Sequence, residues 1–210
     1  MLIVQQVNKG IIKDLNFHIN YGELAYFHSK NTRVIDELLK LLVGITAPES
    51  GIISWLHSRE KPGCPDCDIG IVFKENILIP DRTLLENLYY VMGIKMLDMN
   101  YSRTRLKRIL NVVDLLYCRK KRLQELLPHQ QVRANIAQAI LNYPSTIILN
   151  EPTYQLDQVN TQAIFSLLRE LNKLSMTIIL LSTKSLFGNK EIRFININQC
   201  LDSRKKGFYA

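Results

Sequence analysis

Glu151 is the residue of this sequence with the clearest chemical potential. It stands at the end of an apolar run, residues 146–149, directly after Asn150, and Asp157 follows a short distance on. A glutamate in such a place can take a proton from a water molecule and act as a general base. That role has value only in a complete site, where other groups bind the substrate that the water attacks. The rest of the chain must therefore be searched for those groups.

Strands that alternate with helices are predicted to position this residue. Period-two or continuous apolar patterns indicate strands, and 3.6-residue patterns indicate helices. We expect strands at residues 2–7, 15–19, 23–28, 52–55, 69–73, 146–149, 177–181 and near 192–197, and helices at residues 34–43, 84–92, 102–116, 130–141 and 161–174. This alternation favours an α/β fold with a mostly parallel sheet that helices cover on both sides. The helical stretch at about 83–141 is expected to be an inserted subdomain.

The bulk composition is that of a compact protein without a membrane span. The chain has 210 residues, of which 47% are hydrophobic, so a single domain over residues 1–210 is the simplest expectation. We find no run of about 18 apolar residues, and the first residues lack the basic segment of a signal peptide. A cytoplasmic location is therefore expected.

The charge of the chain is strongly positive and unevenly spread. The net charge is +8, with basic clusters at residues 103–108, 119–122 and 204–206. Such clusters suit polyanions, either nucleic acid or the anionic inner face of a membrane. A solvated helix face is the more ordinary explanation, and we find no zinc-finger spacing, aromatic–basic RNA motif or DNA-reading helix. Specific nucleic-acid binding is not expected.

Two cysteines have a spacing that deserves a separate interpretation. Cys64 and Cys67 could form half a zinc site or a redox pair. No second pair follows, and His57 is the histidine nearest to them. A short loop with two reduced thiols is the better interpretation, so no metal is expected.

Short motifs follow one another along nearly the whole chain, at residues 7–9, 15–17, 22–23, 38–44, 48–51, 69–73, 81–83, 86–87, 137–144, 151–153 and 156–157. Their order resembles that of the ABC-type ATPases, and within them the FtsE-like and MacB/LolD-like branch. The resemblance implies an ABC-type P-loop NTPase fold, with a mostly parallel core sheet, an antiparallel N-terminal β portion and an inserted helical subdomain. In that family an Asp holds a magnesium-bound water and the next Glu activates the attacking water. Here Asn150 replaces the Asp.

The phosphate-binding loop of the family departs furthest from its pattern. Its Gly-x-x-x-x-Gly-Lys-Ser/Thr sequence wraps the phosphates in backbone N–H groups, neutralises them with Lys and coordinates magnesium with the hydroxyl. The corresponding window here is Ser29, Lys30, Asn31, Thr32, Arg33, Val34, Ile35 and Asp36. Val34 resists the positive φ that glycine supplies, Ile35 cannot pair with phosphate, and Asp36 adds negative charge.

The remaining nucleotide motifs are altered as well. Lys74 stands in place of the Q-loop glutamine, Thr183 in place of the switch histidine, and Leu127, Pro128 and His129 in place of the Ser-Gly-Gly signature. No aromatic residue lies between Lys9 and Leu15 to stack on adenine. Glu151, Asp157 and Arg133 survive. We interpret Glu151 as a structural strand-end element, and Asp157 as a loop acceptor or dimer contact. No catalytic residue and no cofactor are expected.

A surface for a membrane partner is implied by the same resemblance. The groove of the family lies between the Q-loop strand and the helical subdomain and holds a short cytoplasmic helix. Apolar candidates for it are Phe73, Leu78, Leu84, Leu85, Leu88, Tyr89 and Tyr90. Each of them could equally pack the core of the subdomain.

Three functions follow, in order of preference. The first is a catalytically degenerate FtsE-like subunit that acts as a nucleotide-independent scaffold or regulator of an FtsX-like membrane protein. It would lie at the inner face of the membrane, with a homodimer and contact to anionic lipids as options. The second is an ATP-binding subunit that retains weak ATP and magnesium binding or hydrolysis. The third is a basic nucleic-acid-binding module.

Overall fold

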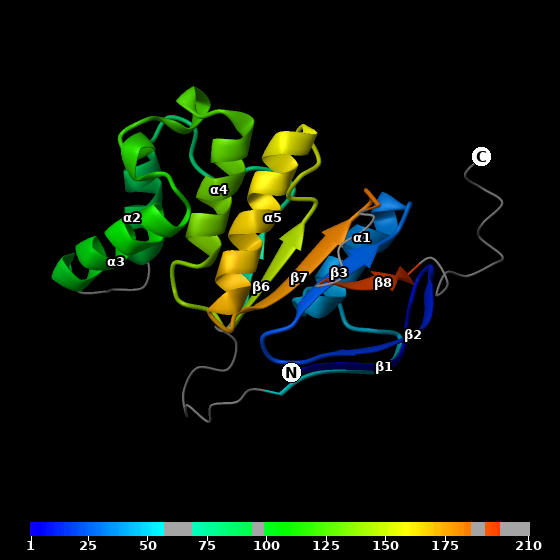
Figure 1. The fold of residues 1–210 in the computed structure, drawn as a ribbon. Helices are drawn as coiled ribbons and strands as arrows, with labels where there is room; N and C mark the ends of the chain where they lie inside the picture. Colours follow the sequence, from blue (N-terminus) through cyan, green and yellow to red (C-terminus); the bar gives the residue numbers. More distant parts are fainter. Residues whose placement is uncertain (57–68, 94–98, 186–191, 198–210) are drawn as a thin grey trace.

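A five-stranded parallel sheet forms the centre of the molecule. The computed structural model describes residues 1–56, 69–93, 99–185 and 192–197. The strands of the sheet are β3 (Leu24–His28), β5 (Ile69–Val72), β6 (Thr146–Asn150), β7 (Thr177–Ser182) and β8 (Arg193–Asn196). Their order is β5-β6-β7-β3-β8, and each neighbouring pair runs parallel. Figure 1 shows β6, β7 and β3 side by side in the middle of the ribbon.

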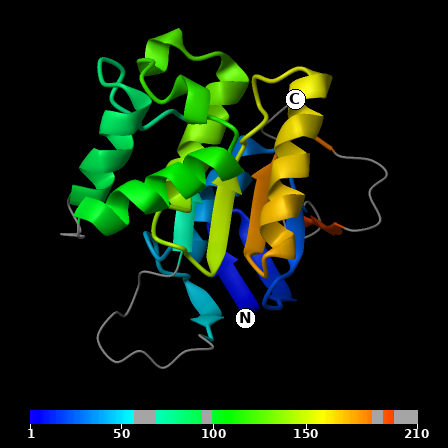
Figure 2. The same ribbon diagram turned by 60° about the vertical axis from the view of Figure 1, so that its left-hand side comes forward.

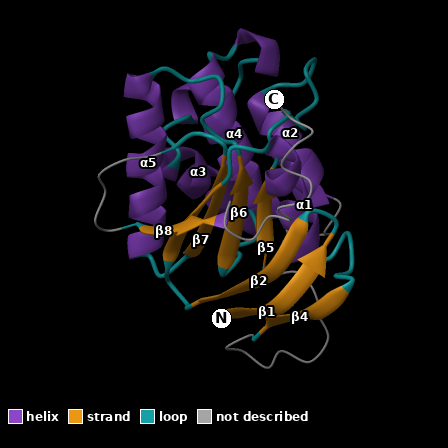
Figure 3. Ribbon diagram, turned by 90° about the vertical axis from the view of Figure 1, so that its right-hand side faces the viewer, coloured by secondary structure: helices purple, strands orange, loops and turns teal. Residues whose placement is uncertain are grey.

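A second, antiparallel sheet is built from the N-terminal part of the chain. Its strands are β1 (Leu2–Lys9), β2 (Ile12–Ile19) and β4 (Ser50–Trp55), in the order β2-β1-β4. Figure 3 shows this sheet below the parallel one, close to α1. The predicted fold class, a mostly parallel core sheet with an antiparallel N-terminal portion, is confirmed.

Helices cover both faces of the parallel sheet. They are α1 (Thr32–Leu42), α2 (Leu84–Gly93), α3 (Met99–Val112), α4 (Pro128–Ala139) and α5 (Gln158–Lys173), with short 3₁₀ turns η1 (Leu116–Cys118) and η2 (Leu123–Glu125). Helices α4 and α5 lie on one face and α1 on the other, while α2 and α3 form the far end of the molecule (Figures 1 and 2). The chain enters the helical region after β5 and leaves it before β6. Its description as a subdomain of one domain stays a prediction.

Adjacent residues of the central strands face two different hydrophobic cores. Ile147 and Leu149 of β6 pack with α4, α5 and the helical region. Ile148, between them, packs with α1 and with residues of the antiparallel sheet. Side chains alternate along a strand in this way because successive Cβ atoms point to opposite faces of the sheet. The continuous apolar runs of these strands therefore reflect burial on both faces.

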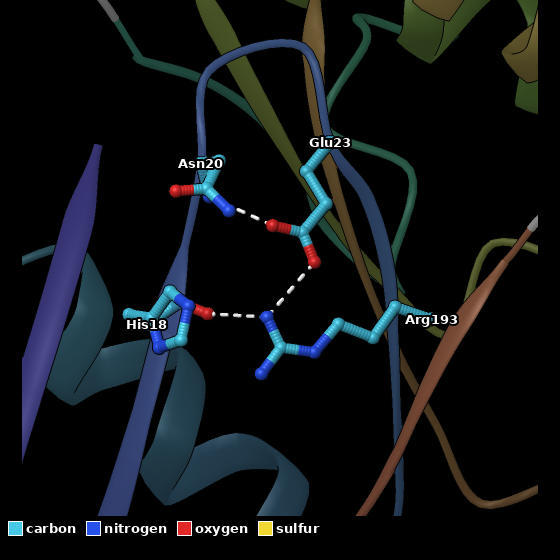
Figure 4. A network of polar contacts seen from close by, with 4 residues as sticks. All are labelled: His18, Asn20, Glu23 and Arg193. Atoms are coloured by element: carbon cyan, nitrogen blue, oxygen red, sulfur yellow. Dashed lines mark hydrogen bonds and ion pairs between the residues drawn. The ribbon is translucent and has the colours of Figure 1, made fainter.

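A polar network attaches the last strand to the front of the chain. Arg193, the first residue of β8, donates from Nη1 to Glu23 Oε1 over 2.9 Å and to the carbonyl oxygen of His18 over 2.7 Å. The other oxygen of Glu23 accepts from the backbone N–H of Asn20 over 2.8 Å. Figure 4 shows Glu23 above Arg193, between the turn after β2 and the start of β8. The network fixes β8 at the edge of the sheet.

Four helices, α1, α3, α4 and α5, begin earlier than the sequence pattern predicts, and a side-chain cap accounts for the starts of α1 and α5. Asn31 accepts from the N–H of Arg33, so α1 begins at Thr32 instead of Val34. Asp157 accepts from the N–H of Asn160, so α5 begins at Gln158 instead of Thr161. Such caps satisfy backbone donors that the first turn of a helix leaves open.

Some sequence features lie outside the described residues. These are Cys64 and Cys67, His57, and the basic cluster at residues 204–206. Within the described part of the chain, no helix is both apolar and long enough to cross a bilayer. In the same residues we find no group of three or more His, Cys, Asp or Glu side chains that could hold a metal ion.

Candidate functional site

The candidate site lies where three parallel strands end. His28 ends β3, Asn150 ends β6 and Ser182 ends β7, and all three side chains are buried. The carboxyl ends of parallel strands meet at one edge of a sheet, and loops at that edge commonly form binding sites in α/β proteins. Helix α1 begins close to this edge, after a connection of residues 29–31. The geometry of this edge decides what the site can do.

The connection from β3 to α1 uses its own backbone donors. The N–H of Asn31 donates to Ser29 Oγ, and the N–H of Arg33 donates to Asn31 Oδ1. The N–H groups of Val34 and Ile35 both point to the carbonyl oxygen of Asn31, over 3.1 and 3.4 Å. These are donors that a phosphate would use at a helix N-terminus. In this conformation the chain itself occupies them.

The side chains of the same window are divided between core and surface. Val34 and Ile35 are fully buried beneath α1, in the core shared with the antiparallel sheet. Lys30 and Arg33 are on the surface. Ile35 stands where a phosphate-binding loop has its lysine, and its burial shows why an apolar residue suits this position.

A carboxylate and an amide face each other across this edge. Asn150 Nδ2 donates to Asp36 Oδ1 over 3.1 Å, which joins β6 to α1. The family resemblance predicts that Asp36 stands at the position of a magnesium-binding hydroxyl and Asn150 at that of a magnesium-binding carboxylate, and this assignment stays a prediction. Asn150 Oδ1 is buried and has no hydrogen-bond partner among the described residues.

Both carboxylate oxygens of Glu151 are engaged by the protein. Ser182 Oγ donates to Oε2 over 2.7 Å, and the backbone N–H of Thr183 donates to Oε1 over 2.6 Å. Glu151 is 3% exposed and has a φ of +49°, a conformation that a non-glycine residue adopts only when its surroundings hold it. As folded, Glu151 links β6 to the segment after β7 and has little contact with solvent. A general base needs access to the water it activates.

Sequence reasoning missed the residues that surround Glu151. The Tyr26 hydroxyl donates to the carbonyl oxygen of Lys184, and burial raises the pKa of Tyr26 to about 12. Lys184 Nζ donates to the carbonyl oxygen of Thr153 over 2.8 Å. Burial also lowers the pKa of His28, which keeps its imidazole neutral beside these groups. Polar residues at the ends of otherwise apolar strands were the signal that could have found them.

The segments in place of the signature and Q-loop have also acquired structural contacts. Pro128 is the first residue of α4 and has no N–H to offer a ligand. Lys74 Nζ lies 4.3 Å from the ring centroid of Tyr154, a cation–π contact that links the ends of β5 and β6. Hydrogen bonds from Asn160 hold the pKa of Asp157 below its usual value, with a smaller effect from His129. Arg133 donates to the carbonyl oxygen of Val113.

The structure changes the set of residues that can meet a partner near α2. Leu78, Leu84 and Leu88 are buried in the core of the helical region, so these three expected groove residues offer no surface. Leu85 and Tyr89 are half-buried against the same core, and Phe73 packs on the α1 side. Tyr90 is 61% exposed, and Ile77 and Ile79 lie exposed nearby in the chain. These exposed residues replace the buried leucines as candidates.

One basic residue expected on a solvated helix face is buried. Arg105 of α3 is 7% exposed, and its guanidinium carbon lies 4.1 Å from the ring centroid of Tyr143. The neighbouring Arg103, Lys107 and Arg108 are exposed. The position of Arg105 fits the tendency of arginine to stack on aromatic rings.

A comparison with models of protein families shows the family to which the chain belongs. The family model described as ABC transporter matches residues 12–154, which include α1, Glu151 and the ends of β3 and β6, but not Ser182 at the end of β7. The chain belongs to the ABC transporter family. The cell division ATP-binding protein FtsE of Escherichia coli K12 is 30% identical over 176 residues, which cover 80% of this chain and 79% of FtsE. Within this family the chain is thus similar to FtsE.

Solved structures of ABC proteins share the fold. The protein cbiO1 from Clostridium perfringens, part of the ABC transporter complex cbiONQ, has a TM-score of 0.79 and 25% identity over 87% of this chain and 78% of cbiO1. The dimeric structure of MJ0796, a bacterial ABC transporter cassette, has a TM-score of 0.75 and 23% identity over 94% of this chain and 95% of MJ0796. The second likeness shows the fold alone.

The family membership corrects the expectation that the protein has no cofactor. ABC ATPases bind ATP with magnesium, FtsE is named an ATP-binding protein, and MJ0796 has also been solved bound to ADP and Pi. The expectation rested on motif residues alone and was wrong in excluding the cofactor of the family.

The residues of this chain fit that cofactor only in part. The strand ends and the start of α1 provide the frame, and Lys30 and Arg33 provide cations at its rim. The backbone donors of Arg33, Val34 and Ile35 are occupied, and position 35 has no charge. No step of hydrolysis can be assigned to Glu151 in this arrangement.

Proposed function

We propose that this chain is an FtsE-type ABC subunit that no longer hydrolyses ATP at a useful rate and serves as a scaffold or regulator of a membrane protein. The observation that carries the proposal is the state of Glu151. Its two oxygens bind Ser182 and Thr183, so the group that would activate water contributes to the fold instead. The Asp36–Asn150 pair supports the same conclusion, since it uses in one hydrogen bond two positions that serve magnesium in the family.

The partner that we propose is an FtsX-like integral membrane protein. A cytoplasmic helix of this partner would contact the exposed residues beside α2, above all Tyr90, and hold the subunit at the inner face of the membrane. A partly exposed aromatic side chain is the kind that anchors a helix in a groove. A homodimer is a further proposal, prompted by the dimeric structure of MJ0796.

Release of phosphate from ATP by the purified protein tests the catalytic part. We expect no magnesium-dependent turnover above the background rate, and the same result for Glu151→Gln. Since Glu151→Gln can also weaken the fold, the double variant Lys30→Ala/Arg33→Ala is measured beside it. Turnover that either variant abolishes, while circular dichroism shows it folded, would establish weak hydrolysis as the function instead.

Copurification with an FtsX-like membrane protein in detergent tests the partner. Tyr90→Glu should abolish capture, because it places a charge in the middle of the proposed contact. Ile45→Glu is the matched control, since Ile45 is 63% exposed and follows α1 on the other side of the molecule. Equal capture of both variants, or equal loss, would disprove this contact.

A further inference from the structure

The turn between η1 and η2 presents basic side chains that the site does not use. Arg119, Lys120, Lys121 and Arg122 are consecutive and all exposed. Among the described residues, no carboxylate forms a salt bridge with any of them. Tyr117, just before them, is 64% exposed, and its hydroxyl accepts from Gln130 Nε2 over 3.1 Å. We call residues 117–122 the basic turn.

The backbone of the basic turn is fixed against the start of α2. The N–H of Leu84 donates to the carbonyl oxygen of Lys121, and the N–H of Leu85 donates to that of Arg119, both over 2.9 Å. Thr83 and Arg122 form an isolated antiparallel bridge. These bonds satisfy donors at the beginning of α2. The basic side chains therefore occupy a defined position beside α2.

Two acidic residues near the basic turn, Glu86 and Glu125, accept hydrogen bonds from its surroundings. Glu86 Oε2 accepts from the N–H and hydroxyl of Thr83, and Glu125 Oε2 accepts from the N–H of Arg122. Asp81 is exposed in the preceding segment beside Arg82, whose charge adds to the basic side. Glu86 and Glu125 remain exposed carboxylates, and hydrogen bonds from Thr83, with a smaller effect of Arg82 and Arg122, lower the pKa of Glu86; the cations of residues 119–122 still outnumber these two carboxylates.

We infer that the basic turn contacts the headgroups of an anionic bilayer. Clustered Lys and Arg side chains are attracted to acidic lipids, and an exposed Tyr suits the interface between water and the acyl chains. The inference rests on the proposed function in one respect: a partner helix beside Tyr90 of α2 would turn this end of the molecule toward the membrane. A tight turn, in contrast to a basic helix, is a poor shape for entering a DNA groove.

Cosedimentation of the full chain with lipid vesicles tests the inference without the membrane partner. We expect binding at low ionic strength to vesicles that mix phosphatidylcholine with phosphatidylglycerol, and none to pure phosphatidylcholine. Lys120→Gln/Lys121→Gln should weaken binding about 30-fold, at the usual contribution of each cation near a charged surface. Lys13→Gln/Lys40→Gln removes the same charge from β2 and α1, on the other side of the sheet (Figure 1), and should leave it nearly unchanged.

Three outcomes would overturn the inference. The first is that the protein does not bind the mixed vesicles. The second is that both double variants lose the same amount of vesicle binding. The third is that Lys120→Gln/Lys121→Gln removes binding to a DNA duplex while vesicle binding persists. The last outcome would assign the turn to nucleic acid. Loss of partner capture by Tyr90→Glu with intact vesicle binding would separate this contact from the partner groove.

Discussion

Asn150 and Asp36 are joined by a single hydrogen bond of 3.1 Å that connects the end of β6 to the first half of α1. The amide of Asn150 donates and the carboxylate of Asp36 accepts; Asn150 is buried, whereas Asp36 is exposed on α1. A second carboxylate in place of Asn150 would be repelled by Asp36 at this distance.

Asn150→Asp should therefore destabilise the protein at neutral pH by about 1–3 kcal/mol. Repulsion raises the pKa of the new carboxyl at position 150 in the folded state above its unfolded value. The loss should disappear below the unfolded pKa, about 4, and be complete above the raised folded value. Urea unfolding at neutral and acidic pH measures this. Asp36→Asn/Asn150→Asp restores one amide and one carboxylate and should recover stability; an equal loss in that variant would contradict the account.

Glu151→Gln should cost about 1–3 kcal/mol of unfolding free energy. Glutamine keeps one acceptor oxygen, which can serve the N–H of Thr183 while its NH₂ group faces Ser182 Oγ; the Ser182 hydroxyl then accepts and loses the charged acceptor to which it donated. Urea unfolding measures the loss. Glu170→Gln makes the same chemical change in an exposed ion pair with Lys173 and should change stability by less than about 0.5 kcal/mol. Similar values for the two variants would show that Glu151 is not structural.

Asn31→Ala should lower stability by about 1 kcal/mol, because it removes the cap on the N–H of Arg33. Asn31→Asp keeps an acceptor in place and should lose little. Thermal unfolding followed by circular dichroism distinguishes the two. A large loss in the aspartate variant alone would mean that charge, and not the cap, matters at this position.

Ile35→Lys, which restores the lysine of the family, should destabilise the protein by about 3 kcal/mol or more, because position 35 is fully buried in an apolar core. Ile35→Val, the size control, should cost about 1 kcal/mol. Equilibrium unfolding in urea compares them. If the lysine variant is as stable as the valine variant, the start of α1 can rearrange to bring that side chain to the surface.

His28 should make the protein less stable on the acidic side of neutrality. Burial lowers the folded-state pKa of His28, so the unfolded chain binds its proton first. Stability is then constant above the unfolded value, about 6.5, and falls as the pH drops from there toward the folded value. His28→Gln should flatten this part of the curve of unfolding free energy against pH. If the slope of unfolding free energy between pH 7.5 and pH 5 is the same in His28→Gln as in the unchanged protein, the pH dependence comes from other groups and the assignment to His28 is wrong.

Most of the fold could be predicted because the relevant signals are local and strong. The apolar runs of β6 and β7 and the glycine-ended pattern of α1 predict elements directly. The starts of α1 and α5 were missed because the side-chain bonds of Asn31 and Asp157 extend each helix beyond its apolar pattern. The order of the strands in the sheet was not predicted, since spacing along the chain does not determine which strands are neighbours.

The candidate site was predictable in its positions but less so in its contacts. The sequence shows that Asn150 is an amide and that Ile35 is apolar. It does not show that Asn150 donates a hydrogen bond to Asp36. Nor does it show that Ser182 and Thr183 donate hydrogen bonds to Glu151. Those contacts join residues far apart in the chain, on different strands. Leu78, Leu84 and Leu88 were assigned to a groove because apolar type alone does not distinguish a core residue from a docking residue.

The side chains of β6 alternate between two hydrophobic cores, and this bears on how the sequence of the protein can diverge. Ile148 belongs to the volume beneath α1, whereas Ile147 and Leu149 belong to the volume beneath α4 and α5. A substitution that reshapes one volume leaves the packing of the other largely as it was, since the backbone of the sheet separates them. The helical side can therefore drift toward new membrane partners while the other side preserves the architecture that both require.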